Sequence, residues 1–461
     1  MLRFLSCRKF CFCCVSCCFV WVCGYLGGMA WMLLCGNVSD VLPPIPVSGD
    51  FKMAKLLPVD SRYQFVPPHT GSLWPRLLSW LVPGHLQRTY GVQEVRVEGA
   101  ERIRELQRAG HGILLTPNHC RMSDALVLQA LSADLDQPFH VMASSHLFRG
   151  SRLQSFLLRR MGAFSIYREG IDRAAVDQAV SILATASRPL VIFPEGALSQ
   201  ANDSLNALQE GVSFIARTAA VRCRRQSEAS ARQIFAVPVA IRYLFDGDLE
   251  AVAEPLLSSI EQRLSWKPLT GVPLVERIVR VGGALLALKE LEYLGSAQAG
   301  TLAARQQRLI DHLLVPAELE WLKSQQTGSV IARVRDLRRA ILPDMIEGQL
   351  PAAEMDRRWA QLNQAELAQS LSLYPSDYVA GDPTVDRILE TIERFNEHLN
   401  GTELHLGPRR AIIEVGEPIA ASAQRDRSAG ADPLLASIEQ QLKSLLQRSS
   451  VHCRRYQPAV S

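Results

Sequence analysis

The sequence has few cysteines in the part of the chain where a disulfide framework would need them. Of its 11 cysteines, all but Cys120, Cys223 and Cys453 lie within the first 35 residues. Stabilising disulfides are spread through the folded body of a protein, so this distribution indicates a reducing compartment and no structural bridges. Cys14 and Cys17 form a Cys-x-x-Cys pair, but no second ligand pair follows at zinc-site spacing. We therefore expect no bound metal.

A strong excess of one charge is also missing. The net charge of +4 is the difference between 50 basic and 46 acidic residues, and no long run of one sign occurs. This balance argues against a nucleic-acid-binding protein. The chain contains no Gly-x-Ser-x-Gly turn, no His-Asp dipeptide and only 10 histidines, which argues against an esterase or a metal-dependent phosphohydrolase. With 461 residues, 48% of them hydrophobic, it is long enough to bury one or two cores.

The N-terminus is apolar and rich in cysteine. No charged residue occurs from Phe10 to Gly36, and Arg3, Arg8 and Lys9 precede this stretch. Three interpretations stay open: a membrane anchor with a cytosolic N-terminus, a signal peptide, or a start assigned too early, with Met53 as the true first residue. We group residues 1–70 as this segment and its linker.

Residues 71–248 alternate between strand-like and helix-like patterns. Such alternation predicts an α/β fold, in which a mostly parallel sheet is flanked by helices. The expected strands are one ending at Thr116 and Phe139–Ala143, Phe164–Tyr167, Pro189–Phe193 and Ile234–Ile241. The expected helices are Ala125–Leu131, Ser151–Arg160, Arg173–Ala186 and Leu205–Ala220.

Residues 249–405 change character, being rich in helix-like patterns and lacking a convincing strand. The expected helical segments are Val275–Leu294, Thr301–Leu314, Ala317–Lys323, Gly328–Ile341 and Pro383–Asn400. A strand at Arg410–Val415 and a helix at Pro433–Leu446 follow, within residues 406–447, before a tail at 448–461. The simplest interpretation is a large helical insertion into one α/β domain, and a separate C-terminal helical domain is the alternative. We find no internal repeat in the sequence.

Asn118 to Asp124 lies at a strand-to-helix turn, where α/β proteins place their chemistry. His119 and Asp124 are five positions apart at the start of a helix. The carboxylate can then accept one imidazole N–H, which leaves the other ring nitrogen free to take a proton from a substrate hydroxyl.

Three further stretches sit at or near strand ends, and their order along the chain is informative. They are Met161–Arg168, Ile192–Gly196 and Val237–Val239. Together with His119-x4-Asp124, they resemble the four motif blocks of the glycerolipid acyltransferases, the superfamily of lysophosphatidate and glycerol-phosphate acyltransferases. The resemblance covers about residues 90–245 and extends to 409–447.

The resemblance implies a membrane-associated O-acyltransferase on the cytosolic face. His119 is then the general base and Asp124 sets its tautomer, while the acceptor hydroxyl attacks the thioester of acyl-CoA or acyl carrier protein. The acceptor is a glycerolipid such as a lysophospholipid, and no further cofactor is needed. Arg168 corresponds to the arginine that binds the acceptor phosphate. The other substrate-binding residues implied are Gly162, Glu195, Gly196 and Ser199.

The chain departs from its relatives after the third block. Many members continue with Thr-Arg-Ser, whereas this chain has Ala197, Leu198 and Ser199. The loss of one cation makes a simple phosphate-bearing acceptor less secure and favours a bulkier or less anionic one. Cys120 adjoins the proposed base, but a neighbour in sequence points its side chain elsewhere, so we do not expect a nucleophile there. A non-catalytic lipid-binding or scaffold protein of the same fold is the alternative function.

Two segments have the composition of membrane-contacting surfaces. Trp74 and Trp80 lie among leucines in residues 72–82, and residues 146–160 mix leucine and phenylalanine with four arginines. For the first segment the competing interpretation is a short helix packed on the domain, and for the second it is a core helix with a solvated polar face. Another basic group can meet CoA phosphates or simply be solvated: Arg222, Arg224, Arg225 and Arg232. The sequence leaves the oligomeric state open.

Overall fold

The computed structural model describes residues 63–170, 172–226, 232–348, 350–374, 376–401, 403–424 and 432–458. The apolar N-terminal segment and most of its linker lie outside the described residues, as do the predictions made for them. The described residues all belong to one compact unit.

Eight strands of the described chain form one mixed sheet in the order β1-β7-β6-β2-β5-β3-β4, with β8 paired to β6. Only the pairings of β6 with β7 and β8 are antiparallel. The predicted fold class, a mostly parallel sheet flanked by helices with a large helical region, is confirmed. The strands are β1 Val92–Glu98, β2 Gly112–Pro117, β3 His140–Ser144, β4 Ala163–Ile166, β5 Leu190–Val191, β6 Ile234–Phe245, β7 Arg409–Val415 and β8 Ile419–Ala420.

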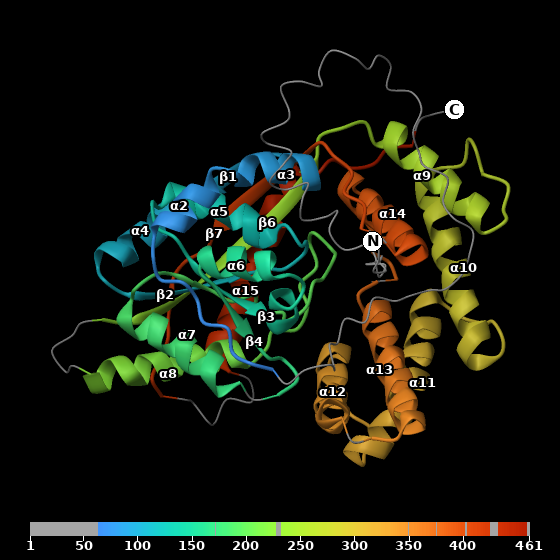
Figure 1. Cartoon of the computed structure of the whole chain (residues 1–461). Coiled ribbons are helices and arrows are strands. Elements are labelled where there is room, and N and C mark those ends of the chain that lie inside the picture. The colour runs from blue at the N-terminus through green and yellow to red at the C-terminus, as the bar shows by residue number, and fades with distance from the viewer. Residues whose placement is uncertain are drawn as a thin grey trace, which may run out of the picture. The chain divides into compact units, whose positions relative to one another are not determined.

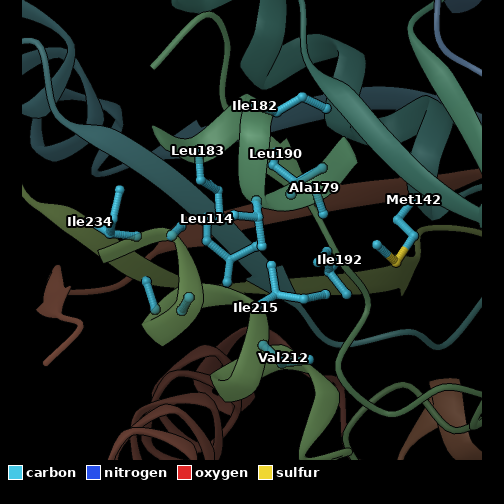
Figure 2. Close-up of a cluster of buried hydrophobic side chains, with 14 of the residues drawn as sticks. Leu114, Met142, Ala179, Ile182, Leu183, Leu190, Ile192, Val212, Ile215 and Ile234 are labelled. Atoms are coloured by element: carbon cyan, nitrogen blue, oxygen red, sulfur yellow. The ribbon is translucent and has the colours of Figure 1, made fainter. Parts of the chain in front are cut away.

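The helices cover both faces of this sheet. Because successive side chains of a strand point to opposite faces, Leu114 of β2 packs in one core while Ile113 and Leu115 pack in the other. Residues of α7, α8 and α15 share the first core (Figure 2), and residues of α3, α4 and α5 share the second. These helices, with α2 and α6 near the sheet in Figure 1, are α2 Leu73–Ser79, α3 Val82–Tyr90, α4 Ala100–Arg108, α5 Asp124–Asp134, α6 Arg152–Arg160, α7 Arg173–Thr185, α8 Gly211–Gln226 and α15 Pro433–Arg448.

Proline is unusual in a central strand, yet Pro238 lies within β6. The strand pairs with β8 at Phe235 and Ala236 and with β7 from Val239 onward. Pro238 therefore lies between the stretch of β6 that pairs with β8 and the stretch that pairs with β7. The missing N–H of the proline costs no hydrogen bond of the sheet at this point.

The helical region lies between β6 and β7 in sequence. Its helices are α9 Leu249–Arg263, α10 Leu274–Leu294, α11 Leu302–Leu322, α12 Val330–Glu347, α13 Ala352–Ser372 and α14 Val385–Asn400. Helices α10 to α13 share one apolar core, whereas α9, α10 and α14 share another with Phe245 at the end of β6. The chain then returns to β7, which lies between β1 and β6.

Several expected boundaries were wrong, among them the end of the helix predicted at Gly328–Ile341, which continues in α12 to Glu347. The segments predicted as Thr301–Leu314 and Ala317–Lys323 form the single helix α11, because packing against α12 and α13 offsets the hydrogen bond lost at Pro316. The helix expected from Leu205 begins only at Gly211, since Gln209 N–H donates to the Pro194 carbonyl 2.8 Å away and keeps the preceding segment in a loop. The strand expected at Pro189–Phe193 pairs only at Leu190–Val191.

The interpretation that the chain has no internal repeat was also wrong. A glutamate near the C-terminal end of α9, α10 and α11 accepts hydrogen bonds from a backbone N–H of the next connection and from an arginine of the next helix, at distances of 2.7–3.1 Å. We call each arrangement a Glu–Arg clasp. The three clasps, spaced about 28 residues apart, are Glu261 with Arg277, Glu290 with Arg305 and Glu318 with Arg333.

The second and third clasps also share their connecting sequence. Ser296-x-Gln298-x-Gly300 precedes α11, and Ser324-x-Gln326-x-Gly328 precedes α12. In both, the glutamine side chain donates to the backbone carbonyl and hydroxyl of the serine two residues earlier. The helical region therefore contains tandem copies of one helix-and-connection unit. The sequence itself carries this repeat, because residues 290–309 and 318–337 are identical at ten of 20 aligned positions.

Candidate active site

Asn118 ends the pairing between β2 and β6 and sets the position of the next residue. Its side-chain amide donates to the Ile241 carbonyl at 3.0 Å and accepts from the Ile241 N–H at 2.7 Å, in the manner of a strand residue. The backbone leaves the sheet directly afterwards. His119 thus lies at the carboxyl end of a parallel strand, where open α/β sheets bind ligands.

The structure brings His119 and Asp124 together. His119 Nδ1 lies 2.8 Å from Asp124 Oδ2, and the imidazole side chain is 22% exposed whereas the carboxylate is fully buried. Asp124 is the first residue of α5. The same Oδ2 accepts the backbone N–H groups of Cys120 at 2.8 Å and Arg121 at 3.0 Å. The two amides fix the carboxylate, so that it can orient the imidazole and leave Nε2 free.

Tyr243 of β6 is a site residue that the sequence did not indicate. Its hydroxyl donates to Asp124 Oδ1 at 2.7 Å and lies 2.9 Å from Ser123 Oγ. Burial raises the pKa of Tyr243 well above its ordinary value, and the nearby Asp124 carboxylate raises it further, so the phenol stays a donor. Tyr243 lies about 120 residues from Asp124, and no local pattern relates the two.

Phe193 and Glu195 support His119 from the end of β5. The Phe193 ring stacks on the imidazole, with centroids 4.0 Å apart. Glu195 Oε1 accepts the His119 N–H at 2.7 Å, and Oε2 accepts the Asn206 N–H at 2.8 Å. Burial raises the pKa of Glu195 to about 7, although both N–H groups favour the ionised form. Both carboxylate oxygens of Glu195, which the sequence predicted to bind substrate, therefore accept backbone N–H groups.

Arg168 and Gly196 lie side by side. Arg168 is exposed, and its guanidinium donates to the Gly196 carbonyl and, at 3.1 Å, to Ser144 Oγ at the end of β3. Gly196 has a φ of +69°, a conformation that suits glycine. The helical region also contacts the neighbourhood of Gly196. Arg335 of α12 donates to Gln209, whose side chain packs against Gly196. Arg168 thus stands at the strand ends with its guanidinium held by two acceptors, and desolvation lowers its pKa.

Gly162 and Ser199 occupy structural positions. Gly162 has a φ of +94°, and a Cβ there would lie 2.5 Å from the Phe139 carbonyl. Ser199 is buried, its N–H donates to the His119 carbonyl at 2.7 Å, and its hydroxyl donates to the Ala201 carbonyl at 3.0 Å. Their predicted binding roles stay predictions, and the geometry shows how each supports a neighbouring loop.

Cys120 is not placed as a nucleophile. The residue is 1% exposed, and its thiol lies 3.8 Å from Asp124 Oδ1. Burial and the nearby carboxylate raise the thiol pKa well above its ordinary value. A thiol that is buried and protonated is a poor nucleophile.

A small cavity separates the 118–124 loop from α14. Leu198, at the position where many relatives carry arginine, lines it together with Arg121, Glu390, Glu393 and Arg394. The helical region therefore contributes charged side chains next to the candidate catalytic pair. In the basic cluster proposed above, by contrast, Arg232 bonds the Gly110 carbonyl before β2, at the opposite end of that strand from His119.

The two segments with membrane-like composition pack together. The rings of Trp74 in α2 and Phe156 in α6 meet edge to face at 5.6 Å, and the Arg160 guanidinium lies over both rings. No residue of α6 is buried, which excludes the interpretation of this segment as a core helix. Within the described chain, no helix combines the length and apolar character needed to span a bilayer. Nor do the described residues contain a group of three or more metal-ligating side chains.

Comparison with known proteins assigns one part of the chain to a family. Residues 94–242 match the family described as Acyltransferase. This part of the chain is an acyltransferase domain of the glycerolipid acyltransferase superfamily, as the motif order indicated, and acyl transfer is its general activity. The matched residues include His119, Asp124, Arg168 and Glu195 but none of the helical region. No curated protein and no solved structure matched the chain.

Proposed function

We propose that the protein transfers a fatty acyl group from acyl-CoA or acyl carrier protein to the hydroxyl of a glycerolipid acceptor such as a lysophospholipid. The observation that carries the proposal is the contact between the partly exposed His119 imidazole and the buried Asp124 carboxylate. Asp124 accepts the Nδ1–H, and Nε2 accepts the proton of the acceptor hydroxyl. The oxygen attacks the thioester carbonyl, the C–S bond breaks, and the leaving thiolate takes the proton from the imidazolium.

The acceptor end of the site is the weaker part of the family pattern. Arg168 supports an anionic group there, because an exposed arginine at the strand ends offers a fork of donors. Leu198 supplies apolar surface instead of a second cation. We therefore propose an acceptor with one anionic group and a substantial apolar part.

A membrane surface is the proposed site of action, on its cytosolic face. Large apolar side chains are exposed beside arginines on α2 and α6, which suits the headgroup region of an anionic bilayer. A non-catalytic lipid-binding protein with this fold is the competing function, and catalytic activity separates the two.

The test is acyl transfer with labelled acyl-CoA or acyl carrier protein and a panel of lysolipids. We expect diacyl product from the parent protein and a loss of at least 100-fold in His119→Ala, because the general base is removed. His452→Ala, an exposed histidine outside the acyltransferase match, is the control. No transfer with any donor and acceptor would exclude the enzyme and leave the lipid-binding function, whereas equal rates in His119→Ala would show that His119 is not the general base.

A further inference from the structure

Arg121 connects the candidate catalytic pair to the helical region. Its backbone N–H donates to Asp124 Oδ2 at 3.0 Å, while its guanidinium contacts Glu390 and Glu393 of α14, each at 3.2 Å. The arginine side chain is 13% exposed, and the two glutamates are 4% and 7% exposed. The guanidinium also lies 5.5 Å from the centre of the ring of Tyr243, whose hydroxyl bonds Asp124. One residue thus joins Asp124 to side chains about 270 positions away.

We propose that α14 is a positioning element for the His119–Asp124 pair. Glu390 and Glu393 fix the side chain of Arg121, and Arg121 fixes the loop whose backbone amides bind Asp124. This inference rests on the proposed function for its catalytic consequence. It assigns the helical region a role in catalysis although no residue of that region lies within the acyltransferase match.

The same face of α14 also contacts the loop that follows β5. Residues 390, 393 and 397 are three and four positions apart, so their side chains share one face of the helix. Glu390 Oε2 accepts the Asn202 N–H at 3.2 Å, and Glu397 Oε2 accepts from Gln200 at 3.1 Å. The backbone of this loop bonds the His119 carbonyl through Ser199. Both loops that surround His119 are therefore attached to α14.

Helix α14 is itself tied to the sheet, which makes it a rigid support. Asp386 Oδ1 accepts the Phe245 N–H at 2.7 Å, just where β6 ends. Glu393 Oε1 accepts from Arg409 at the start of β7 and from the Leu406 N–H at 2.6 Å. Apolar side chains of the helix, including Ile388 and Ile392, are fully buried in the core shared with α9 and α10. Movement of α14 relative to the active-site loops would break these contacts.

The chemistry of the contact makes it sensitive to single substitutions. Removing Arg121 leaves Glu390 buried without the arginine that bridges it to Glu393, and removing Glu390 leaves the Arg121 guanidinium with only one of its two carboxylate partners. The remaining charge then draws in water or moves its loop. Because the loop amides at 120 and 121 bind Asp124, we expect that movement to misalign the imidazole and lower kcat.

The test compares Arg121→Met, Glu390→Gln and Arg121→Lys with the parent full-length chain. We expect the first two to lower kcat at least tenfold, with the KM for donor and acceptor within twofold of the parent. Arg121→Lys, which keeps the charge but loses the planar fork, should fall between. Glu318→Gln is the matched control, because it breaks a buried glutamate–arginine pair of the helical region that has no contact with the loop.

A second measurement does not depend on activity. Cys120 is buried within the loop, and Cys223 is buried in α8 as an internal reference. Alkylation of each thiol, followed by peptide mass spectrometry, should be at least tenfold faster at Cys120 in Arg121→Met and Glu390→Gln, with Cys223 unchanged. Glu318→Gln should alter neither kcat nor the reactivity of Cys120.

The outcomes separate this inference from the proposed function. Unchanged Cys120 reactivity in both variants overturns the positioning role, as does a kcat within twofold of the parent, or an equal loss of kcat in Glu318→Gln. A parent protein without transferase activity overturns the proposed function instead. In that case the Cys120 measurement still decides whether α14 fixes the loop.

Discussion

Glu195 illustrates how one buried carboxylate supports this site. It is fully buried, and its two oxygens accept backbone N–H groups from His119 and Asn206, which lie on different loops. Burial raises its pKa to about 7, so the side chain changes its charge near neutral pH. Tyr243 and Arg121 are comparable, because each acts on Asp124 rather than on a substrate.

The raised pKa of Glu195 predicts a dependence of stability on pH. Between about pH 4.5 and 7, the unfolded chain has released the proton of this carboxyl while the folded chain retains it. Folding is therefore disfavoured progressively as the pH rises through this window. Glu195→Gln lacks the titrating group, so the free energy of unfolding of the parent relative to the variant should fall by on the order of 2–3 kcal/mol.

Urea denaturation at pH 5 and at pH 8 measures this difference. Glu101→Gln, the same chemical change on the surface of α4, is the control and should show no comparable change with pH. A parent-to-variant difference that is equal at the two pH values would show that burial does not raise the pKa of Glu195.

Among the elements, the helices α9 to α12 are joined in succession by the buried Glu–Arg clasps. Glu261, Glu290 and Glu318 are each fully buried, and each joins one helix to the next through a bidentate arginine. In each clasp the arginine pairs with the charge of the buried glutamate. The same glutamate accepts a backbone N–H of the connection, which fixes where the next helix begins. The repeated unit thereby keeps the helices of this region in register.

Replacing only one partner of a Glu–Arg clasp should destabilise the fold. We expect Glu318→Met to lower the free energy of unfolding by about 3 kcal/mol, because Arg333 is left buried without its main partner. The double variant Glu318→Met with Arg333→Met should recover at least half of that loss, since an apolar pair removes the stranded charge. Denaturation monitored by circular dichroism measures both variants. A double variant less stable than the single one would show that the ion pair itself stabilises the fold.

At the scale of the whole molecule, one pair of helices combines exposed apolar side chains with exposed arginines. Leu73 and Leu77 of α2, with Trp80 just after it, are 57–75% exposed, and Leu153 and Phe156 of α6 are 38–39% exposed. The arginines of the same helices, such as Arg76 and Arg152, are exposed as well. Apolar side chains that enter the headgroup region, next to cations that meet anionic lipid, are typical of an interfacial surface.

Binding to vesicles tests this surface. A chain that starts at Met53, and so omits the apolar N-terminal segment, should sediment with vesicles that contain anionic lipid and bind neutral vesicles more weakly. Leu73→Gln combined with Trp80→Gln should weaken binding at least tenfold, because two large apolar side chains no longer leave water. Leu319→Gln, at an exposed leucine of α11, is the control. Equal binding by the double variant and the parent would place the lipid contact elsewhere.

The sequence by itself determined the α/β class and the pair His119 and Asp124. Both follow from local patterns, since the alternation of strand and helix repeats over short windows, and five positions at a helix start bring the two side chains together. It also indicated the strand ends that carry Arg168 and Glu195. Where the local pattern was ambiguous, as at Pro316 or at residues 205–210, packing and loop hydrogen bonds decided the boundary.

Only the tertiary structure decided which distant residues complete the site. Tyr243 reaches Asp124 because β6 runs beside β2, and Glu390 reaches Arg121 because α14 is tied to the ends of β6 and β7. It also placed β7, after the whole helical region, between β1 and β6. Contacts over such separations depend on topology, and a hydrogen bond between two single side chains leaves no periodic trace in the sequence of either partner.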